Sequence, residues 1–149
     1  MAEHVLRHAE HKDLERLIEL VHQLSPPKPH EANVSNGQLR CILDNLIKDD
    51  NYHVCVLEKE GRVLATATLL LQMNLSHGGR PFGHIENVVV DTKQRGQGLG
   101  KVIIDHLLEK AREKNCYKVV LSCKKDLNVP FYAKCGLKES GQVEMRLDL

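Results

Sequence analysis

The sequence feature that most constrains this fold is a run of valines followed by a glycine-rich turn and a helix. The valines at 88–90 end an apolar strand pattern, and Gly96, Gly98 and Gly100 follow at alternate positions. Helical spacing of apolar residues then begins at Val102. Such a turn gathers backbone N–H groups at a helix N-terminus, where the helix dipole also favours an anion. The pattern predicts an α/β protein that binds a pyrophosphate at this turn.

Two better-known phosphate-binding patterns do not fit the turn. The glycines lack the acidic residue that follows in a parallel dinucleotide-binding unit, so a Rossmann site is excluded. The P-loop pattern Gly-x4-Gly-Lys-Ser/Thr is also absent, because Val102 follows Lys101. The turn therefore matches neither pattern, and a tight turn that only connects a strand to a helix remains the alternative to an anion site.

The rest of the chain predicts one domain, residues 1–149, without a linker or repeat. Period-two and buried patterns predict strands at 4–8, 52–57, 63–73, 84–90, 117–123 and 143–147. Helical spacing predicts helices through 14–24, 39–47, 102–111 and 128–134, the second opened by a capping box at Ser35 and Gln38. This order predicts an α/β (α+β) fold with a mixed central sheet of six to seven strands and helices on both faces.

Composition excludes several classes of function. A net charge of +1 and 3% aromatic residues argue against nucleic-acid binding, which needs a concentrated positive surface. No apolar run approaches the roughly 20 residues that span a bilayer, and the first residues lack an apolar signal core. We therefore expect no membrane partner and a cytoplasmic location. The five cysteines predict free thiols in a reducing compartment, and nine scattered histidines without ligand spacing predict no metal.

Two segments of the chain resemble signatures of the GNAT superfamily of N-acetyltransferases. Residues 94–100 match its Q/R-x-x-G-x-G/A pattern, and Asn128-x-x-Phe131-Tyr132 is similar to its second signature. The resemblance implies a GNAT fold and acetyl-CoA as co-substrate, with pyrophosphate on the turn, the pantetheine arm along residues 88–90, and Tyr132 beside the sulfur. The implied cofactor-binding residues are Val88, Val89, Val90, Arg95, Gly96, Gln97, Gly98, Leu99, Gly100, Lys101, Asn128 and Tyr132.

Within the superfamily, the blocks at 83–90, 95–101, 116–119, 131–136 and 143–145 resemble the glucosamine-6-phosphate N-acetyltransferases. This resemblance implies direct transfer of acetyl to the amine of D-glucosamine 6-phosphate in a ternary complex, a step towards UDP-N-acetylglucosamine. It also implies an intertwined homodimer in which the last strand helps complete the partner's site. Two positions depart from the pattern, since Asn87 and Ser122 stand where those enzymes have acids.

The chemistry of acetyl transfer suggests the catalytic residues, Glu86, Asn87 and Tyr132. The attacking amine must be neutral, and Glu86 is the best candidate for accepting its proton through water. A charged side chain in a buried strand is costly, which favours a functional role for Glu86. Asn87 can hydrogen-bond a hydroxyl or the amine, and the N–H near Val88 can polarise the thioester oxygen. Tyr132 can protonate the departing thiolate. The acceptor-binding candidates are Ser25, His77, Glu86, Asn87, Tyr117, Lys118 and Arg146.

Two alternatives remain open on the sequence. The amide and hydroxyl at Asn87 and Ser122 favour an N-acetyltransferase for another small amine, such as a polyamine, an amino acid or an aminoglycoside. The second alternative is a regulatory acetyl-CoA-binding module without strong activity. The presence of Glu86, Asn128 and Tyr132 argues against it. A screen of amine acceptors separates the three.

Overall fold

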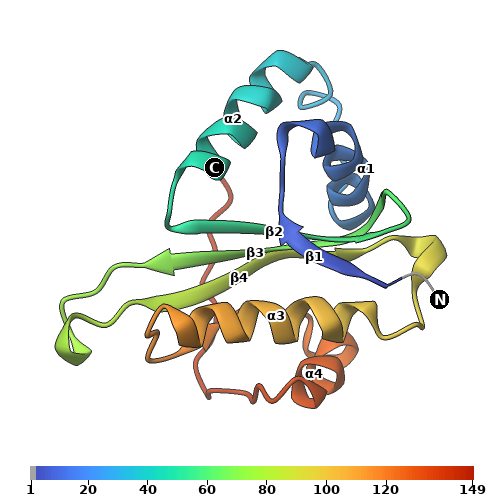
Figure 1. Cartoon of the computed structure of the whole chain (residues 1–149). Coiled ribbons are helices and arrows are strands. Elements are labelled where there is room, and N and C mark those ends of the chain that lie inside the picture. The colour runs from blue at the N-terminus through green and yellow to red at the C-terminus, as the bar shows by residue number, and fades with distance from the viewer. Residues whose placement is uncertain (1–2) are drawn as a thin grey trace.

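A single sheet organises the chain, which a computed structural model describes from residue 3 to residue 149 (Figure 1). The first four strands are antiparallel neighbours in chain order, and β5 joins the edge of β4 in parallel. The strands are β1 (Val5–His8), β2 (Tyr52–Lys59), β3 (Arg62–Gln72), β4 (Phe82–Val90) and β5 (Val119–Val120). This mixed α/β architecture confirms the predicted fold class.

The helices cover both faces of the sheet (Figure 1). The first pair, α1 (Leu14–Leu24) and α2 (Asn36–Lys48), packs on one face, while α3 (Leu99–Glu113) and α4 (Lys125–Lys134) pack on the other. Short 3₁₀ turns lie at His11–Asp13, His77–Gly79 and Thr92–Gln94. The second helix begins at the predicted capping box, in which the Gln38 N–H donates to Ser35 Oγ at 3.2 Å. None of the helices in the described part of the chain has the length and hydropathy to cross a membrane.

Alternation along the strands builds two cores. On the α3 face, Leu57, Leu69 and Ile85 pack with Ile103 and Leu107. The opposite core is made from the other side of the same sheet, by Val54, Val56, Val63, Val89, Leu17, Leu20 and Leu43. Burying one such side chain fully contributes about 1.5–3 kcal/mol, so both helical layers are fixed on the sheet.

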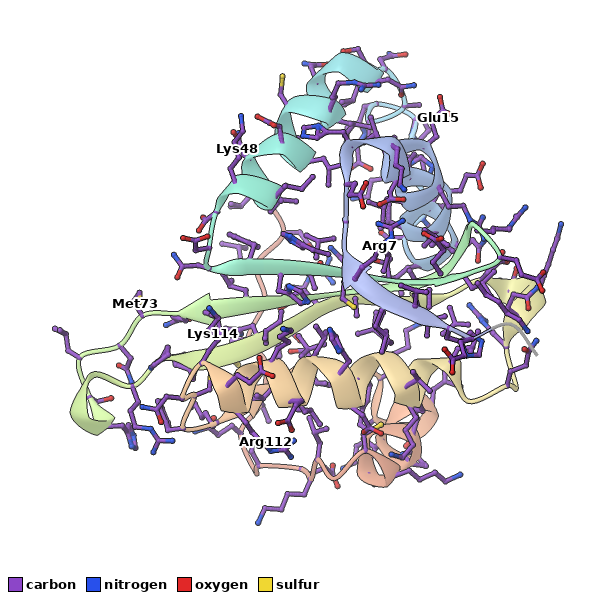
Figure 2. All side chains as sticks on the ribbon, in the orientation of Figure 1. Arg7, Glu15, Lys48, Met73, Arg112 and Lys114 are labelled. Atoms are coloured by element: carbon purple, nitrogen blue, oxygen red, sulfur yellow. The ribbon has the colours of Figure 1, made fainter. Side chains whose placement is uncertain are left out.

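A charged residue on β1 ties the start of the chain to the sheet. Figure 2 shows Arg7 between the first helical layer and the strands. Its guanidinium donates to both carboxylate oxygens of Asp13, at 2.7 and 2.9 Å, and to Glu58 at 2.6 Å. Asp13 is 5% exposed, so this bidentate pair is largely shielded from water. It fixes the entry of α1 against β2.

The C-terminal part differs from the sequence prediction. The strand predicted over 117–123 is reduced to Val119–Val120, because β5 pairs with β4 only at Gly83 and His84. Residues 143–147 form no strand, and Val143, Met145 and Leu147 are at least 80% exposed. Within the described residues, this tail pairs with no strand of the sheet. The sheet therefore has five strands, where the sequence predicts six to seven.

Candidate functional site

The glycine-rich turn forms the N-terminus of α3 as predicted. Gly96 and Gly98 have φ angles of 82° and 78°, a left-handed conformation that side chains disfavour. Gly98 is the N-cap, and no described side chain caps the helix, so its first N–H groups are available to a ligand. A Cβ atom built on either glycine would meet no atom within 4 Å. The turn is thus uncapped and open, as a site for an anion at a helix N-terminus requires.

The two predicted cations of the turn differ in their contacts. Lys101 Nζ lies 2.5 Å from Asp105 Oδ2, one turn further along α3, and this contact raises the pKa of Lys101. Arg95 is exposed, and its Nε donates weakly to the Val90 carbonyl at 3.4 Å. Arg95 therefore carries the less neutralised charge beside the turn, while the backbone supplies the donors.

A buried aspartate that the sequence analysis missed holds the entry to this turn. Asp91 follows the valines and is 3% exposed. Its carboxylate accepts from the Lys93 N–H at 3.1 Å and pairs with Arg16 of α1, and these contacts hold its pKa below the usual range. Gln23 Oε1 accepts from the Thr92 N–H at 2.9 Å. An Asp directly after a strand and before a turn is a capping signal that sequence alone could have revealed.

Replacing Asp91 with alanine is expected to lower the free energy of unfolding by about 2 kcal/mol, because it removes a buried carboxylate that bonds the largely buried Arg16 guanidinium. The folded-state pKa of Asp91 is depressed, so its contribution is present above its unfolded pKa of about 3.9 and disappears as the pH falls below it. Urea denaturation at pH 7 and near pH 3 measures both effects. The control is Asp44→Ala, which breaks a surface pair with Lys48 and is expected to change stability by about 0.5 kcal/mol or less. Equal losses in the two variants would contradict the assignment.

A bulge interrupts β4 next to the turn. Glu86 pairs with Thr68 and Val89 with Thr66, so Asn87 and Val88 together oppose Ala67. Asn87 has a φ of 52°. The prediction that Glu86 lies in a buried strand is wrong, because the bulge leaves both Glu86 and Asn87 exposed. An exposed carboxylate reaches water directly, so Glu86 can still relay a proton.

The same strand is open along one edge. Its pairing with β5 ends at His84, and within residues 3–149 no other strand lies on that side. The three valines at 88–90 follow in this open stretch, with Val89 buried on one face and its neighbours packed on the other. Backbone groups here are therefore free to bond an extended ligand that arrives from the glycine-rich turn.

The fourth helix, which carries Asn128 and Tyr132, packs against the glycine-rich turn. A Cβ on Gly100 would lie 3.0 Å from the Phe131 ring, so the start of α3 packs closely on α4. Tyr132 is half-buried, and burial raises its pKa, with the Cys123 and Cys135 thiols raising it further. The phenol is therefore protonated at neutral pH and can donate. Asn128 lies four residues earlier on the same face of the helix.

Three acceptor candidates meet near the start of β4. The rings of His77 and Tyr117 stack with centroids 3.8 Å apart. Lys118 Nζ lies 4.8 Å from the Phe82 ring centroid and 5.4 Å from that of Tyr117. This aromatic cluster with a cation is suited to an anionic or sugar-like ligand.

The other two acceptor candidates lie elsewhere. Ser25 ends α1, two residues after the Gln23 side chain that bonds Thr92. Arg146 lies in the exposed tail and pairs with Asp148 at 2.7 Å. Within the described residues, no hydrogen bond or ion pair joins either side chain to the cluster around Tyr117. The single chain therefore assembles only part of the predicted acceptor site.

β4 places these parts in a line. Glu86 stands four residues from Phe82, about 13 Å at the usual rise of a strand, and, across the bulge, about 10 Å from Val90 at the other end. The aromatic and cationic cluster lies at the first end, and the glycine-rich turn follows the second. The strand can thus hold a diphosphate-bearing ligand along its open edge and a second, anionic molecule near its start, with Glu86 between them.

Known proteins share the fold of this chain. The acetyltransferase (GNAT) family model matches residues 15–137. A glucosamine 6-phosphate N-acetyltransferase of Trypanosoma brucei brucei is 37% identical over 97% of this chain and 95% of its own length. The crystal structure of a Trypanosoma brucei acetyltransferase superposes with a TM-score of 0.86 at 38% identity, covering 99% of this chain and 100% of that one. For glucosamine-6-phosphate N-acetyltransferase from Arabidopsis thaliana the TM-score is 0.84 at 31% identity, over 98% and 99% of the two chains.

Proposed function

Because the chain belongs to the acetyltransferase (GNAT) family, we propose that it transfers the acetyl group of acetyl-CoA to the amine of D-glucosamine 6-phosphate. The observation that carries the proposal is the order of parts along β4, from an uncapped anion site, through Glu86, to a cluster with Lys118. Relatives named for this activity match the chain over nearly its whole length.

Acetyl-CoA supplies the activated acetyl group as a thioester. Its pyrophosphate fits the N–H groups that open α3, from Leu99 to Lys101, because no described side chain occupies them. The flanking residues Arg95, Gly96, Gln97, Gly98 and Gly100 shape this site. The open edge of β4 at Val88, Val89 and Val90 offers backbone groups to the pantetheine arm, and the Asn128 amide of α4 offers it a further hydrogen bond.

Three groups of the chain serve the transfer itself. The acceptor amine must lose a proton, and the exposed Glu86 carboxylate accepts it through water. The Val88 N–H, within the bulge, can donate to the thioester oxygen as negative charge develops there. The Tyr132 phenol, protonated because burial raises its pKa, donates its proton to the departing sulfur.

The phosphate of the acceptor explains the cluster at the start of β4. Lys118 can act as a point charge for phosphate, and His77 and Tyr117 can contact the sugar. Asn87 offers an amide in place of a carboxylate, which keeps hydrogen bonding to the amino sugar and weakens the hold on its ammonium form.

Glucosamine 6-phosphate is expected to show a kcat/KM at least about tenfold above that of glucosamine, since a charged contact to phosphate contributes about 1.5–3 kcal/mol. Release of free CoA measures both rates. Lys118→Ala should reduce the advantage of the phosphorylated substrate, and Lys48→Ala, at an exposed site on α2 outside the cluster, should leave it unchanged. Asn87→Asp should retain activity.

A higher kcat/KM for polyamines, amino acids or aminoglycosides would replace the amino-sugar assignment with an N-acetyltransferase for another small amine. Acetyl-CoA binding without turnover of any amine would instead favour a regulatory module. Neither outcome would contradict the proposed acetyl-CoA site. The screen therefore tests the assignment of the acceptor independently of the assignment of the donor.

We also propose that the protein is a homodimer in the cytoplasm. The tail carries alternate apolar residues that are almost fully exposed, Val143, Met145, Leu147 and Leu149. A second copy could bury this edge and bring Arg146 to an acceptor site that the single chain leaves incomplete. Light scattering is expected to give twice the 16.9 kDa mass of one chain, and Met145→Asp should shift it towards the monomer. Five free cysteines are consistent with a reducing compartment.

A further inference from the structure

Histidine side chains from three elements meet on the α3 face of the sheet, away from the proposed acetyl-transfer site. His8 of β1 pairs directly with Cys55 of β2, and His53 lies two residues before Cys55. Paired residues and residues two apart in a strand point to one face. The third helix covers that face and contributes His106 (Figure 1).

These side chains are close enough to share one ion. A ring nitrogen of His53, one of His106 and the Sγ atom of Cys55 all lie within 4.8 Å of one another. The ring of His8 stacks on that of His53 with centroids 5.0 Å apart. Four side chains that commonly bind metals thus form one group, although they are spread over 99 positions of sequence, from 8 to 106.

The hydrogen bonding of the group is incomplete. The Nε2 atoms of His8, His53 and His106 are all buried, and none has a hydrogen-bond partner among the described residues. Cys55 is fully buried, and its thiol makes only a 3.8 Å contact with the Val56 carbonyl. Buried polar atoms in folded proteins nearly always have a partner, so three neighbouring imidazoles without one point to a missing ligand.

We propose that His53, Cys55 and His106 form a transition-metal site, with His8 placed to become the fourth ligand. Two or three imidazoles and a thiolate match Zn²⁺ and disfavour Mg²⁺ and Ca²⁺, which prefer oxygen. Zinc holds nitrogen at about 2.0–2.1 Å and sulfur at about 2.3 Å, so side-chain shifts of roughly an ångström close the set. On binding, the Cys55 thiol loses its proton to solvent and the sulfur bonds the ion.

The charges around the group are compatible with such an ion. Lys110 and Lys114, the latter at the end of α3 (Figure 2), lie near enough to act on the His53 ring and oppose an added cation. The thiolate charge of Cys55 offsets this opposition. The site would fasten β1 and β2 to α3, a structural role separate from acetyl transfer.

The test uses Co²⁺ as a spectroscopic probe of the Zn²⁺ site, added to full-length protein freed of metal with a chelator. We expect one equivalent to bind, with the visible bands of tetrahedral Co²⁺ and a near-ultraviolet thiolate-to-cobalt charge-transfer band, and Zn²⁺ to displace it. Cys55→Ala should abolish the charge-transfer band, and His106→Gln should weaken binding at least about tenfold. The controls are Cys135→Ala and His22→Gln, a buried thiol and an exposed imidazole outside the group.

Absence of stoichiometric binding overturns the proposal, as does a charge-transfer band that persists in Cys55→Ala. Should Cys55→Ala fail to fold, alkylation of the native protein decides the matter, since Cys41 and Cys123 are exposed and Cys55 is not. A band that survives alkylation supports the buried site. A band lost with the exposed thiols shows an adventitious ion only and rejects it.

Discussion

Replacing Gly98 with valine is expected to weaken CoA binding at least about 100-fold. Gly98 is the N-cap of α3, and its φ of 78° opens the helix N-terminus towards unoccupied space. A valine side chain would project into that space and displace the pyrophosphate from the N–H groups. Loss of two charge-assisted hydrogen bonds of about 1.5–3 kcal/mol each accounts for this size of effect. Isothermal titration calorimetry with CoA measures it.

The matched control for Gly98→Val is Gly61→Val. Gly61 has nearly the same φ, 77°, and a Cβ there also meets no atom within 4 Å, but it lies in the turn between β2 and β3. Both variants carry the strain of a side chain at positive φ, about 1–2 kcal/mol. Only Gly98→Val should lose CoA affinity. Unchanged affinity in a folded Gly98→Val protein, or equal losses in both variants, would show that the turn does not bind the pyrophosphate.

Tyr132→Phe is expected to lower turnover by roughly 100-fold, within a range of about 10- to 1000-fold, with little loss of acetyl-CoA affinity. The substitution keeps the ring, which contacts Phe131 with centroids 4.9 Å apart, and removes only the hydroxyl. The departing thiolate then loses its proton donor, while the turn that binds the pyrophosphate is untouched. Steady-state kinetics with saturating substrates, together with calorimetry, separate the two effects.

Tyr52→Phe serves as the comparison, because Tyr52 begins β2 and lies outside the proposed site. Its turnover should match that of the unmodified protein. If Tyr132→Phe turns over equally fast, the phenol does not assist the leaving group. If its acetyl-CoA affinity falls as much as its rate, Tyr132 binds the co-substrate and the proton donor must be sought elsewhere.

The parts of the structure that depend on residues close together in sequence were predicted correctly. The turn from Gly96 to Gly100 follows from glycine spacing between a strand and a helix, and the structure places it at the start of α3. The capping box at Ser35 likewise depends on residues three positions apart. Such features need no knowledge of distant neighbours, which is why they were predictable.

Features that depend on partners far away in sequence were not predictable. The 117–123 pattern gave no sign that only Val119 and Val120 pair with β4. The histidine group joins His8, His53 and His106, which no spacing rule connects. The burial expected of Glu86 failed because the one extra residue of β4 cannot be located without its partner strand. Register and packing are properties of pairs, and a single sequence does not state them.

At the bulge in β4, the number of residues decides which face of the sheet the following side chains point to, whatever side chain the extra residue carries. Ile85 faces α3, yet Val89, four residues later, faces α1, whereas an uninterrupted strand would put both on one side. The extra residue at Asn87 thus shifts the alternation of side chains by one position, so the residues after it point to the opposite faces of the sheet. A substitution at this position would leave this shift in place. Deleting it would turn the three valines over and carry the glycine-rich turn to the wrong layer of the molecule.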